Sequence, residues 1–419
     1  MRSGARRTAL VVAVAAISSA LATVALPATG AIAKPKPPAH KSPKAHPAPP
    51  PSPAPDAPAN WREIGGSQMA SGGIVVNYPA GKHPWKLPKV PASAYVIANA
   101  ANGQVLAAKD AHGLFPPAST LKVLTAITML PRLDPNAQLK TSKLATSVEP
   151  NIVGLVRGRT YRVADLFRAL LLISANDAAV SLVQSAGSFS KGMALLNAEA
   201  HHLQAYDVVA KQPNGLPAAG QVVSAYDLAL IARQALATPA FMKYDETWSA
   251  KFRVNKKKIV DLVNQNYLLT QYKGGIGGKI GWTEAAEATY VGMARRHGVT
   301  LIVTVLHCTS LQEITSAEKL LNWGFAMNGH VKPVGTLVSP LAPKPAHPAV
   351  SHHQKHGSVL PKEQVANDRR SLAGPAANSG SSQLTMAVTI AAVLSVGVAA
   401  IILYRRRHQL ERTQPPAAN

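Results

Sequence analysis

The pattern of hydrophobic and polar positions divides the chain into two apolar ends, two polar proline-rich stretches and a central region of mixed character. In the central region, apolar runs at 94–97 and 105–108 flank Asn102-Gly103, a pair that favours the tight turn of a β-hairpin. Helical periodicity fills the middle of the region, and strand-like runs return near its end. The expected helices are 118–130, 163–173, 190–202, 224–237 and 317–325, and the further strands are 278–283, 289–294 and 299–307.

The order of these elements predicts the fold class. Strands at both ends of the central region, with helices between them, indicate an antiparallel sheet that is assembled from distant segments and covered by helices. The expected class is therefore α+β. The region spans residues 84–328, which is long enough for one domain with a substantial core.

Both ends of the chain carry membrane-type segments. Three arginines precede the apolar run 9–26, and Ala31-Ile32-Ala33 gives the small-x-small pattern of a cleavage site, so residues 1–33 are predicted to be a signal peptide. An uncleaved N-terminal anchor is the alternative, because the run approaches spanning length. The uncharged run 384–404 predicts one C-terminal transmembrane helix, with a buried helix as the alternative, and the arginines after it predict a cytoplasmic tail at 405–419. Together the ends predict a single-pass membrane protein with an extracellular central domain.

Two polar stretches connect the central domain to these ends. Residues 34–83 are rich in proline and are predicted to form a linker, and residues 329–383 are predicted to form a Pro/His-rich disordered tether. A disordered segment fixes no ligand geometry, so we expect no metal at the histidines of the tether. These histidines are His347, His352, His353 and His356.

Composition adds two constraints. The formal net charge of +24 would suit nucleic acid, but an exported chain instead meets anionic lipid head groups and wall polymers, so no nucleic acid partner is expected. The single cysteine, Cys308, follows an apolar run and is expected to be a small buried residue without a catalytic role.

Three short motifs carry the candidate chemistry. In chain order they are Ser119-Thr-Leu-Lys122, Ser174-Ala-Asn176 and Lys279-Ile-Gly281, a set and order typical of serine acyl-transfer sites. Each motif has an ordinary alternative when taken alone. The first could be an exposed helical pair, the second could cap the helix that starts at Asp177, and the third could hold an exposed strand lysine.

The residue types in these motifs suit nucleophilic catalysis. A serine hydroxyl needs a nearby base, and residues three apart on a helix share one face, so Lys122 can reach Ser119 Oγ. Lys122 must be neutral to accept a proton, and burial together with a second cation, for which Lys279 is the candidate, would lower its pKa. Ser174 can relay a proton, and Asn176 has both donors and acceptors for a substrate amide. Gly281 would let the substrate backbone approach its strand closely.

With these motifs and others, residues 91–325 resemble the D-alanyl-D-alanine carboxypeptidases, the low-molecular-weight penicillin-binding proteins of serine peptidase family S11. The further matching segments are Pro116-Pro-Ala-Ser-Thr-Leu-Lys122, Asn214-Gly-Leu-Pro217, Ser224-Ala-Tyr-Asp-Leu228, Asn266-Tyr-Leu-Leu269 and Leu321-Asn-Trp-Gly-Phe325. The resemblance implies a β-lactamase/transpeptidase-like fold with a helical subdomain. It also implies that the domain faces the cell wall and needs no cofactor.

The resemblance also implies roles for individual residues. Ser119 would attack the bond between two terminal D-alanines of a peptidoglycan stem peptide, with Lys122 as base, and penicillins and other β-lactams would acylate the same serine. Ser174 and Lys279 would pass a proton to the departing D-alanine, and Asn176 would orient the peptide. The backbone amides of Ser119 and Trp282 would form the oxyanion hole.

One position departs from the family pattern. Ile280 stands where members usually have Thr or Ser, whose hydroxyl is expected to bind the substrate carboxylate. Losing such a bond costs about 1.5 to 3 kcal/mol, or about ten- to a hundredfold in binding. Thr283 is a substrate-binding candidate that could replace part of this contact. The departure leaves open a catalytically impaired wall-binding or regulatory protein, whereas a serine β-lactamase is disfavoured because no Glu-x-x-Leu-Asn segment follows Ser174.

Overall fold

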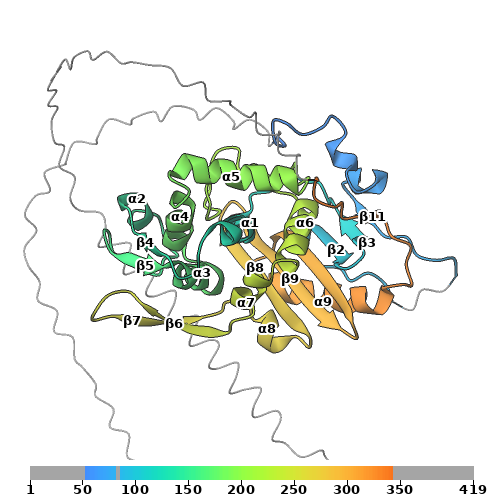
Figure 1. The fold of residues 1–419 in the computed structure, drawn as a ribbon. Coiled ribbons are helices and arrows are strands. Elements are labelled where there is room, and N and C mark those ends of the chain that lie inside the picture. The colour runs from blue at the N-terminus through green and yellow to red at the C-terminus, as the bar shows by residue number, and fades with distance from the viewer. Residues whose placement is uncertain (1–51, 82–84, 343–419) are drawn as a thin grey trace, which may run out of the picture. The chain divides into compact units, whose positions relative to one another are not determined.

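The computed structural model describes residues 52–81 and 85–342, which are coloured in Figure 1. The expected signal peptide, transmembrane segment 384–404 and cytoplasmic tail lie outside the described residues, as do residues 34–51 of the linker and 343–383 of the tether. In the part of the chain that the structure describes, no helix is both long and apolar enough to cross a bilayer.

An antiparallel sheet forms the centre of the fold and joins the two ends of the domain. Neighbouring strands of the sheet follow the order β1-β3-β2-β10-β9-β8, and β11 pairs with the first two residues of β3. The hairpin β2–β3 is the one expected around Asn102-Gly103, and β8 to β10 are the three expected late strands. The strands are β1 (Ile74–Val75), β2 (Ala92–Asn99), β3 (Gln104–Lys109), β8 (Gly275–Thr283), β9 (Glu287–Arg296), β10 (Val299–Cys308) and β11 (Gly335–Thr336).

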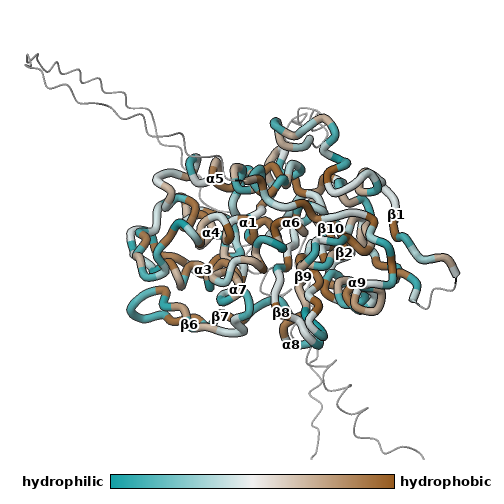
Figure 2. Tube along the Cα trace, turned by 45° about the vertical axis from the view of Figure 1, so that its right-hand side comes forward, coloured by the Kyte–Doolittle hydropathy of each residue, from teal (hydrophilic) through white to brown (hydrophobic). Residues whose placement is uncertain are grey.

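The two faces of this sheet bury two different hydrophobic clusters. Along β2, Val96 and Ala98 face the helices α1 and α6, whereas Tyr95 and Ile97 face the C-terminal helix α9 (Glu313–Met327). This alternation follows from the two-residue period of a strand that is buried on both sides. Figure 2 shows the hydrophobic positions gathered along the central strands and the helices beside them. The antiparallel sheet with helices on both faces confirms the expected α+β class.

A helical subdomain is inserted between β3 and β8 and contains most of the larger cluster. The four predicted ranges 118–130, 163–173, 190–202 and 224–237 agree with η3–α1, α3, α5 and α6, whereas α2, α4, α7 and α8 were not predicted. The Ser224 hydroxyl caps α6 by accepting a hydrogen bond from the Asp227 N–H at 3.0 Å. The helices are η3 (Ala118–Leu121), α1 (Lys122–Met129), η4 (Leu130–Arg132), α2 (Lys143–Thr146), α3 (Val163–Leu172), α4 (Asn176–Gln184), α5 (Phe189–His202), α6 (Ala225–Leu236), α7 (Pro239–Asp245) and α8 (Leu268–Gln271).

Two small hairpins were not expected from the sequence. One pairs β4 (Gln138–Lys140) with β5 (Thr160–Arg162), and the other pairs β6 (Ser249–Arg253) with β7 (Ile259–Val263). The second hairpin buries Phe252 and Leu262 but leaves Ile259 and Val263 exposed. Its polar and apolar residues therefore do not alternate cleanly, which explains why the strand pattern was missed.

Folded structure extends beyond the expected range 84–328 at both ends. Before it, the short helices η1 (Trp61–Glu63) and η2 (Ser67–Ala70) and strand β1 pack onto the domain, and Met69 is fully buried. After it, β11 pairs with β3 and Leu337 is buried. Residues 52–81 and 329–342, expected in the linker and tether, thus belong to the folded part because they bury apolar side chains against it.

Candidate active site

The candidate nucleophile, Ser119, lies in the short helix η3 that leads into α1. The preceding residue, Ala118, has a φ of 46°, an unfavourable value for a residue with a side chain. The loop around Gly215 packs closely against this turn, because a Cβ added to Gly215 would lie 1.7 Å from the Ala118 carbonyl oxygen. The turn that presents Ser119 is therefore strained and tightly held, as is common at functional sites.

Lys122 is placed to act on Ser119. Its Nζ lies 2.8 Å from Ser119 Oγ, and it donates hydrogen bonds to Asn176 Oδ1 at 2.8 Å and to the Asn214 carbonyl at 2.7 Å. The side chain is fully buried. Burial and, to a smaller extent, the charge of Lys279 hold the pKa of Lys122 well below its ordinary value. The exposed helical pair is thus excluded, and the buried amine can take a proton from the hydroxyl.

The second motif faces the same point from the start of α4. Ser174 has a φ of 61°, and its buried Oγ has no hydrogen-bond partner among the described residues. The Nδ2 of Asn176 donates to the Glu149 carbonyl at 2.9 Å, which fixes the orientation of its amide. The residue before α4 is Ala175, and no side chain caps this helix. Ser174 and Asn176 therefore are not the helix caps that the sequence alone allowed.

The third motif lies on β8, the edge strand beside the nucleophile. Lys279 is only 2% exposed, which excludes an ordinary surface lysine. Burial lowers the pKa of Lys279 to about 8, although the nearby Asp245 opposes this shift. Burial in turn raises the pKa of Asp245 to about 7, while the hydrogen bond from Gly278 N–H and the charge of Lys279 oppose it.

Gly281 brings β8 against the nucleophile. A Cβ on Gly281 would lie 2.6 Å from the Ser119 backbone nitrogen, so a side chain at this position would push the strand and the serine apart. We expected Gly281 to admit the substrate backbone, and the structure shows that it admits the backbone of Ser119. This close approach brings the amide of Ser119 beside the strand that carries the amide of Trp282.

Trp282 and Thr283 complete this side of the site. The indole of Trp282 is 62% exposed and donates to Ser310 Oγ at 2.8 Å. The Thr283 hydroxyl accepts a hydrogen bond from the Ala286 N–H at 3.1 Å and still carries a proton that it can donate.

The three motifs meet in one open cleft of about 220 Å³. It lies between β8, the start of α4 and the loop that packs on the nucleophile turn. The residues that line it are Ser119, Pro150, Asn151, Ser174, Asn176, Gly215, Leu216, Gln265, Ile280, Gly281, Trp282, Thr283 and Glu313.

The structure adds three acidic residues that the sequence did not reveal as parts of the site. Asp245 lies near Lys279, and Glu313 lines the cleft. Asp177 directly follows Asn176 on α4. The Asp177 carboxylate accepts hydrogen bonds from the backbone N–H groups of residues 153, 154 and 155 at 3.1, 2.9 and 2.9 Å. No local spacing signals such a role, because each partner comes from a distant segment.

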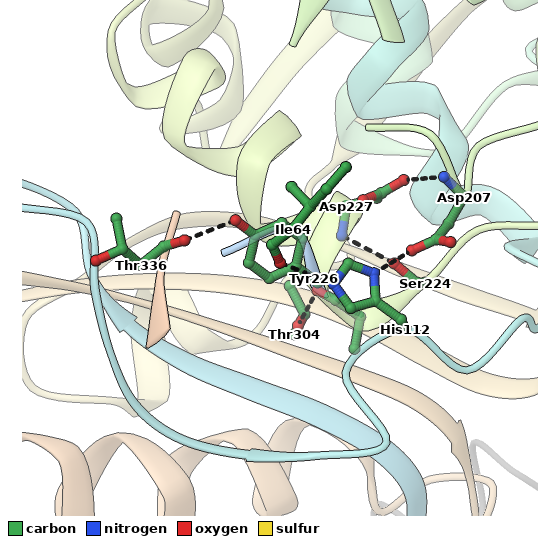
Figure 3. A network of polar contacts seen from close by, with 9 residues as sticks. Ile64, His112, Asp207, Ser224, Tyr226, Asp227, Thr304 and Thr336 are labelled. Carbon is green, nitrogen blue, oxygen red and sulfur yellow. Dashed lines mark hydrogen bonds and ion pairs between the residues drawn. The ribbon is translucent and has the colours of Figure 1, made fainter. Parts of the chain in front are cut away.

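A separate polar cluster lies away from this cleft, where the N-terminal segment packs on α6 (Figure 3). His112, Asp207 and Asp227 offer ligand atoms within 4.8 Å of one another, the geometry of a possible metal site. However, His112 Nδ1 lies 2.6 Å from Asp207 Oδ2, and its Nε2 lies 3.0 Å from the Ile64 carbonyl. Both ring nitrogens are thus engaged in hydrogen bonds, so the cluster is explained as a link between Ile64 and the domain.

Comparison with known proteins agrees with this architecture. The family profile described as D-alanyl-D-alanine carboxypeptidase matches residues 82–310. The carboxypeptidase DacB2 of Mycobacterium tuberculosis is 38% identical, over 62% of this chain and 90% of the relative. DacF of Bacillus subtilis is 27% identical, over 56% of this chain and 62% of the relative, so the chain spans less than two thirds of that protein.

Solved structures show the same fold. A D-alanyl-D-alanine carboxypeptidase from Mycobacterium tuberculosis superposes with a TM-score of 0.59 at 37% identity, covering 62% of this chain and 99% of that one. A mutant DD-transpeptidase from Streptomyces gives a TM-score of 0.55 at 28% identity, covering 57% and 99%. With the family profile matched across the segment that carries all three motifs, the chain belongs to the D-alanyl-D-alanine carboxypeptidase family of serine peptidases.

Proposed function

We propose that this protein removes the terminal D-alanine from peptidoglycan stem pentapeptides during cell-wall maturation, through an acyl-enzyme on Ser119. The observation that carries the proposal is the fully buried amine of Lys122, which lies 2.8 Å from Ser119 Oγ and has a lowered pKa. A lysine in this state is a general base for the hydroxyl.

The proposed reaction assigns a step to each of these side chains. Lys122 accepts the proton of Ser119 Oγ as the oxygen attacks the carbonyl carbon of the penultimate D-alanine. The backbone N–H groups of Ser119 and Trp282 stabilise the negative charge on the carbonyl oxygen. A proton then passes by way of Ser174 and Lys279 to the nitrogen of the departing D-alanine, and the C–N bond breaks. Water hydrolyses the ester and restores the serine.

Supporting residues hold the peptide and tune the site. Asn176 lines the cleft, and hydrogen bonds with Lys122 and with the Glu149 carbonyl fix the orientation of its side-chain amide. The amide is therefore preorganised to bind a peptide amide. Gly281 and Thr283 belong to the strand along which the peptide would lie. The complete set of groups is assembled, and nothing in the arrangement favours a purely wall-binding role.

We propose in addition that the catalytic domain faces the cell wall and is anchored through residues 384–404. The sequence supports this proposal. Residues 384–404 form an apolar run of spanning length, three arginines follow this run, and a signal-type segment stands at the other end of the chain. Fractionation of cells that express the full chain or a chain ending at residue 383 tests this. Release of the shorter protein from membranes is expected, and its retention would contradict the anchor.

The activity is tested with full-length protein and a pentapeptide ending in D-Ala-D-Ala, followed by mass spectrometry. Loss of one alanine, abolished by Ser119→Ala, is the expected result. Labelling of wild-type protein by a fluorescent penicillin, absent in the same variant, reports that Ser119 is competent. An intact peptide after incubation with untreated enzyme, from a preparation that the penicillin labels in a parallel assay, would reject the carboxypeptidase activity.

A further inference from the structure

One end of the cleft can be assigned to the leaving residue of the substrate. The amide of Trp282 belongs to the oxyanion hole, and Lys279 precedes it by three residues on β8. Because Lys279 belongs to the path that protonates the leaving amine, the leaving residue must lie toward this part of the strand. The two residues between them, Ile280 and Gly281, both border the cleft, and Ile280 is the one with a side chain; it is half-buried and packs on the apolar cluster beneath β8.

Glu313 lies on the same wall of the cleft. It is the first residue of α9, and among the described residues that line the cleft it is the only one with a chargeable carboxyl or amino group. The Trp282 indole reaches the same loop by its hydrogen bond to Ser310. Arginine and lysine are missing from the described lining, and the buried amine of Lys279 donates a hydrogen bond to the Ile280 carbonyl at 2.8 Å. The side chains of Ile280, Trp282 and Glu313 therefore offer an acid and an apolar surface but no cation of their own.

The Glu313 carboxylate accepts hydrogen bonds from the backbone, but one of its oxygens has no hydrogen-bond donor among the described residues. Burial raises the pKa of this carboxyl, and hydrogen bonds from the backbone N–H groups of Glu313 and Leu311 oppose the shift. Its Oε2 is buried and has no hydrogen-bond partner among the described residues. A buried acceptor without a donor is unfavourable, and a ligand with an N–H group would relieve that cost.

We propose that Glu313 is a specificity-determining residue that disfavours a free carboxylate on the leaving residue and favours a leaving residue with an amide or an amine there. Two carboxylates that lie close together in one cleft repel, and this favours the uptake of a proton by one of them. An amide or ammonium group could instead donate to Oε2. Ile280 acts in the same direction because it gives a carboxylate no hydrogen bond. The preferred substrates are therefore stem peptides whose leaving residue carries an amide in place of the free carboxylate.

This inference rests on the proposed function, because it concerns which peptides the same serine cleaves. The covalent steps are identical for both kinds of leaving residue. In each, the Ser119 Oγ–C bond forms, the peptide C–N bond breaks, the serine proton ends on the leaving amine, and water later cleaves the ester. The change in the ratio of the two rates when Glu313 is substituted therefore reports recognition of the leaving residue.

The test compares two pentapeptides that differ only in the last residue, D-alanine with a free carboxylate or D-alanine carboxamide. Full-length wild type, Glu313→Gln and Glu284→Gln are measured at one pH and ionic strength. Glu284 is the matched control, because it is exposed and lies two residues after Trp282 but outside the cleft lining. Stoichiometric labelling of Ser119 by penicillin shows that each variant is folded and competent.

We expect wild type to have the higher kcat/KM for the carboxamide. Glu313→Gln should reduce the preference about tenfold, mainly through a lower KM for the free acid, which corresponds to about 1.4 kcal/mol. Glu284→Gln should leave the preference unchanged. A wild-type preference for the free acid, or an equal effect of both substitutions, would overturn the inference while the proposed function stands. Cleavage of neither peptide by untreated enzyme, from a preparation that penicillin labels stoichiometrically in a parallel assay, would reject the function and the inference together.

Discussion

The Asp245 carboxylate accepts a hydrogen bond of 2.7 Å from the backbone N–H of Gly278, directly before Lys279 on β8. This contact holds the start of the third motif against the helical subdomain. It also places a buried acid near a buried amine: burial raises the pKa of Asp245 to about 7 and lowers the pKa of Lys279 to about 8. A Cβ on Gly277 would lie 2.3 Å from Asp245 Oδ2, so this contact also requires a glycine beside it.

Asp245→Asn should shift the alkaline limb of the pH–rate profile to lower pH. The negative charge of Asp245 raises the pKa of Lys279, so its removal lowers that pKa further and the protonated donor is lost earlier as pH rises. The Asn side chain can still accept from Gly278 N–H, which preserves the strand. Profiles of kcat/KM measured between pH 6 and 10 check this, and an unmoved limb would contradict a role of Lys279 as proton donor.

Lys122→Met should abolish catalysis without unfolding the protein. Loss of the base is expected to slow acylation of Ser119 by about 10² to 10⁴-fold. The substitution also removes a buried amine whose charged form is disfavoured, but it leaves Asn176 Oδ1 and the Asn214 carbonyl without their donor. We expect these effects to offset each other, so that Tm changes little. Penicillin acylation kinetics and thermal unfolding measure the two effects, and a large fall in Tm would show that Lys122 is chiefly structural.

The sequence predicted the elements whose signals are local. The hairpin around Asn102-Gly103, the capped helix α6 and the late strands β9 and β10 each depend on periodicity or turn chemistry within one segment. The three motifs were found because their spacing and order are distinctive. The fold class and the elements that carry the first and third motifs followed from these patterns, whereas α4, which begins at Asn176 of the second motif, was not predicted.

The supporting acids could not be predicted because they act across long sequence separations. Asp245 acts on a strand 33 residues later, and Asp177 holds backbone amides 22 to 24 residues earlier. The ends of the domain were misjudged for a similar reason. The segment around Met69 is polar and rich in small residues, yet it is fixed by a few buried side chains and by pairing of β1 with β3.

Asp177→Asn should weaken the protein and shift the acidic limb of activity to lower pH. An amide at this position presents N–H groups to the backbone donors of residues 153–155, so at least one buried hydrogen bond is lost, at a cost of about 1 to 3 kcal/mol. The charge of Asp177 raises the pKa of Lys122, so its removal lets Lys122 become neutral at lower pH. Denaturant titrations and pH–rate profiles measure both effects.

Asp165→Asn is the control for that experiment. Asp165 accepts from Arg168 at 2.6 Å on the surface of α3, so its loss should cost at most about 1 kcal/mol and leave the acidic limb in place. Equal shifts of the acidic limb in both variants would show that general surface charge, and not Asp177, sets the pKa of Lys122.

Asp227→Asn should stabilise the protein more at pH 8 than at pH 5. Burial, and then the charge of Asp207, raise the pKa of Asp227 well above its ordinary value of 3.8. Folding therefore favours the neutral acid, and its contribution to stability is lost as pH rises through the folded pKa. The amide remains an acceptor for Asp207 N–H and never ionises. Thermal unfolding at both pH values checks this, with the exposed Asp261→Asn as control; an equal change in Tm at both pH values would contradict it.

Ile280→Thr should have opposite effects on activity and stability. A hydroxyl at this position could donate to a substrate carboxylate, and such a bond is expected to raise kcat/KM for the free-acid pentapeptide by about tenfold or more. Ile280 is also half-buried against the apolar cluster beneath β8, so the smaller polar side chain should lower stability by about 1 kcal/mol. Ile280→Val is the matched control, because it keeps the branched shape without the hydroxyl. If both variants changed activity alike, the size of residue 280, and not its hydrogen bonding, would determine how the leaving residue is bound.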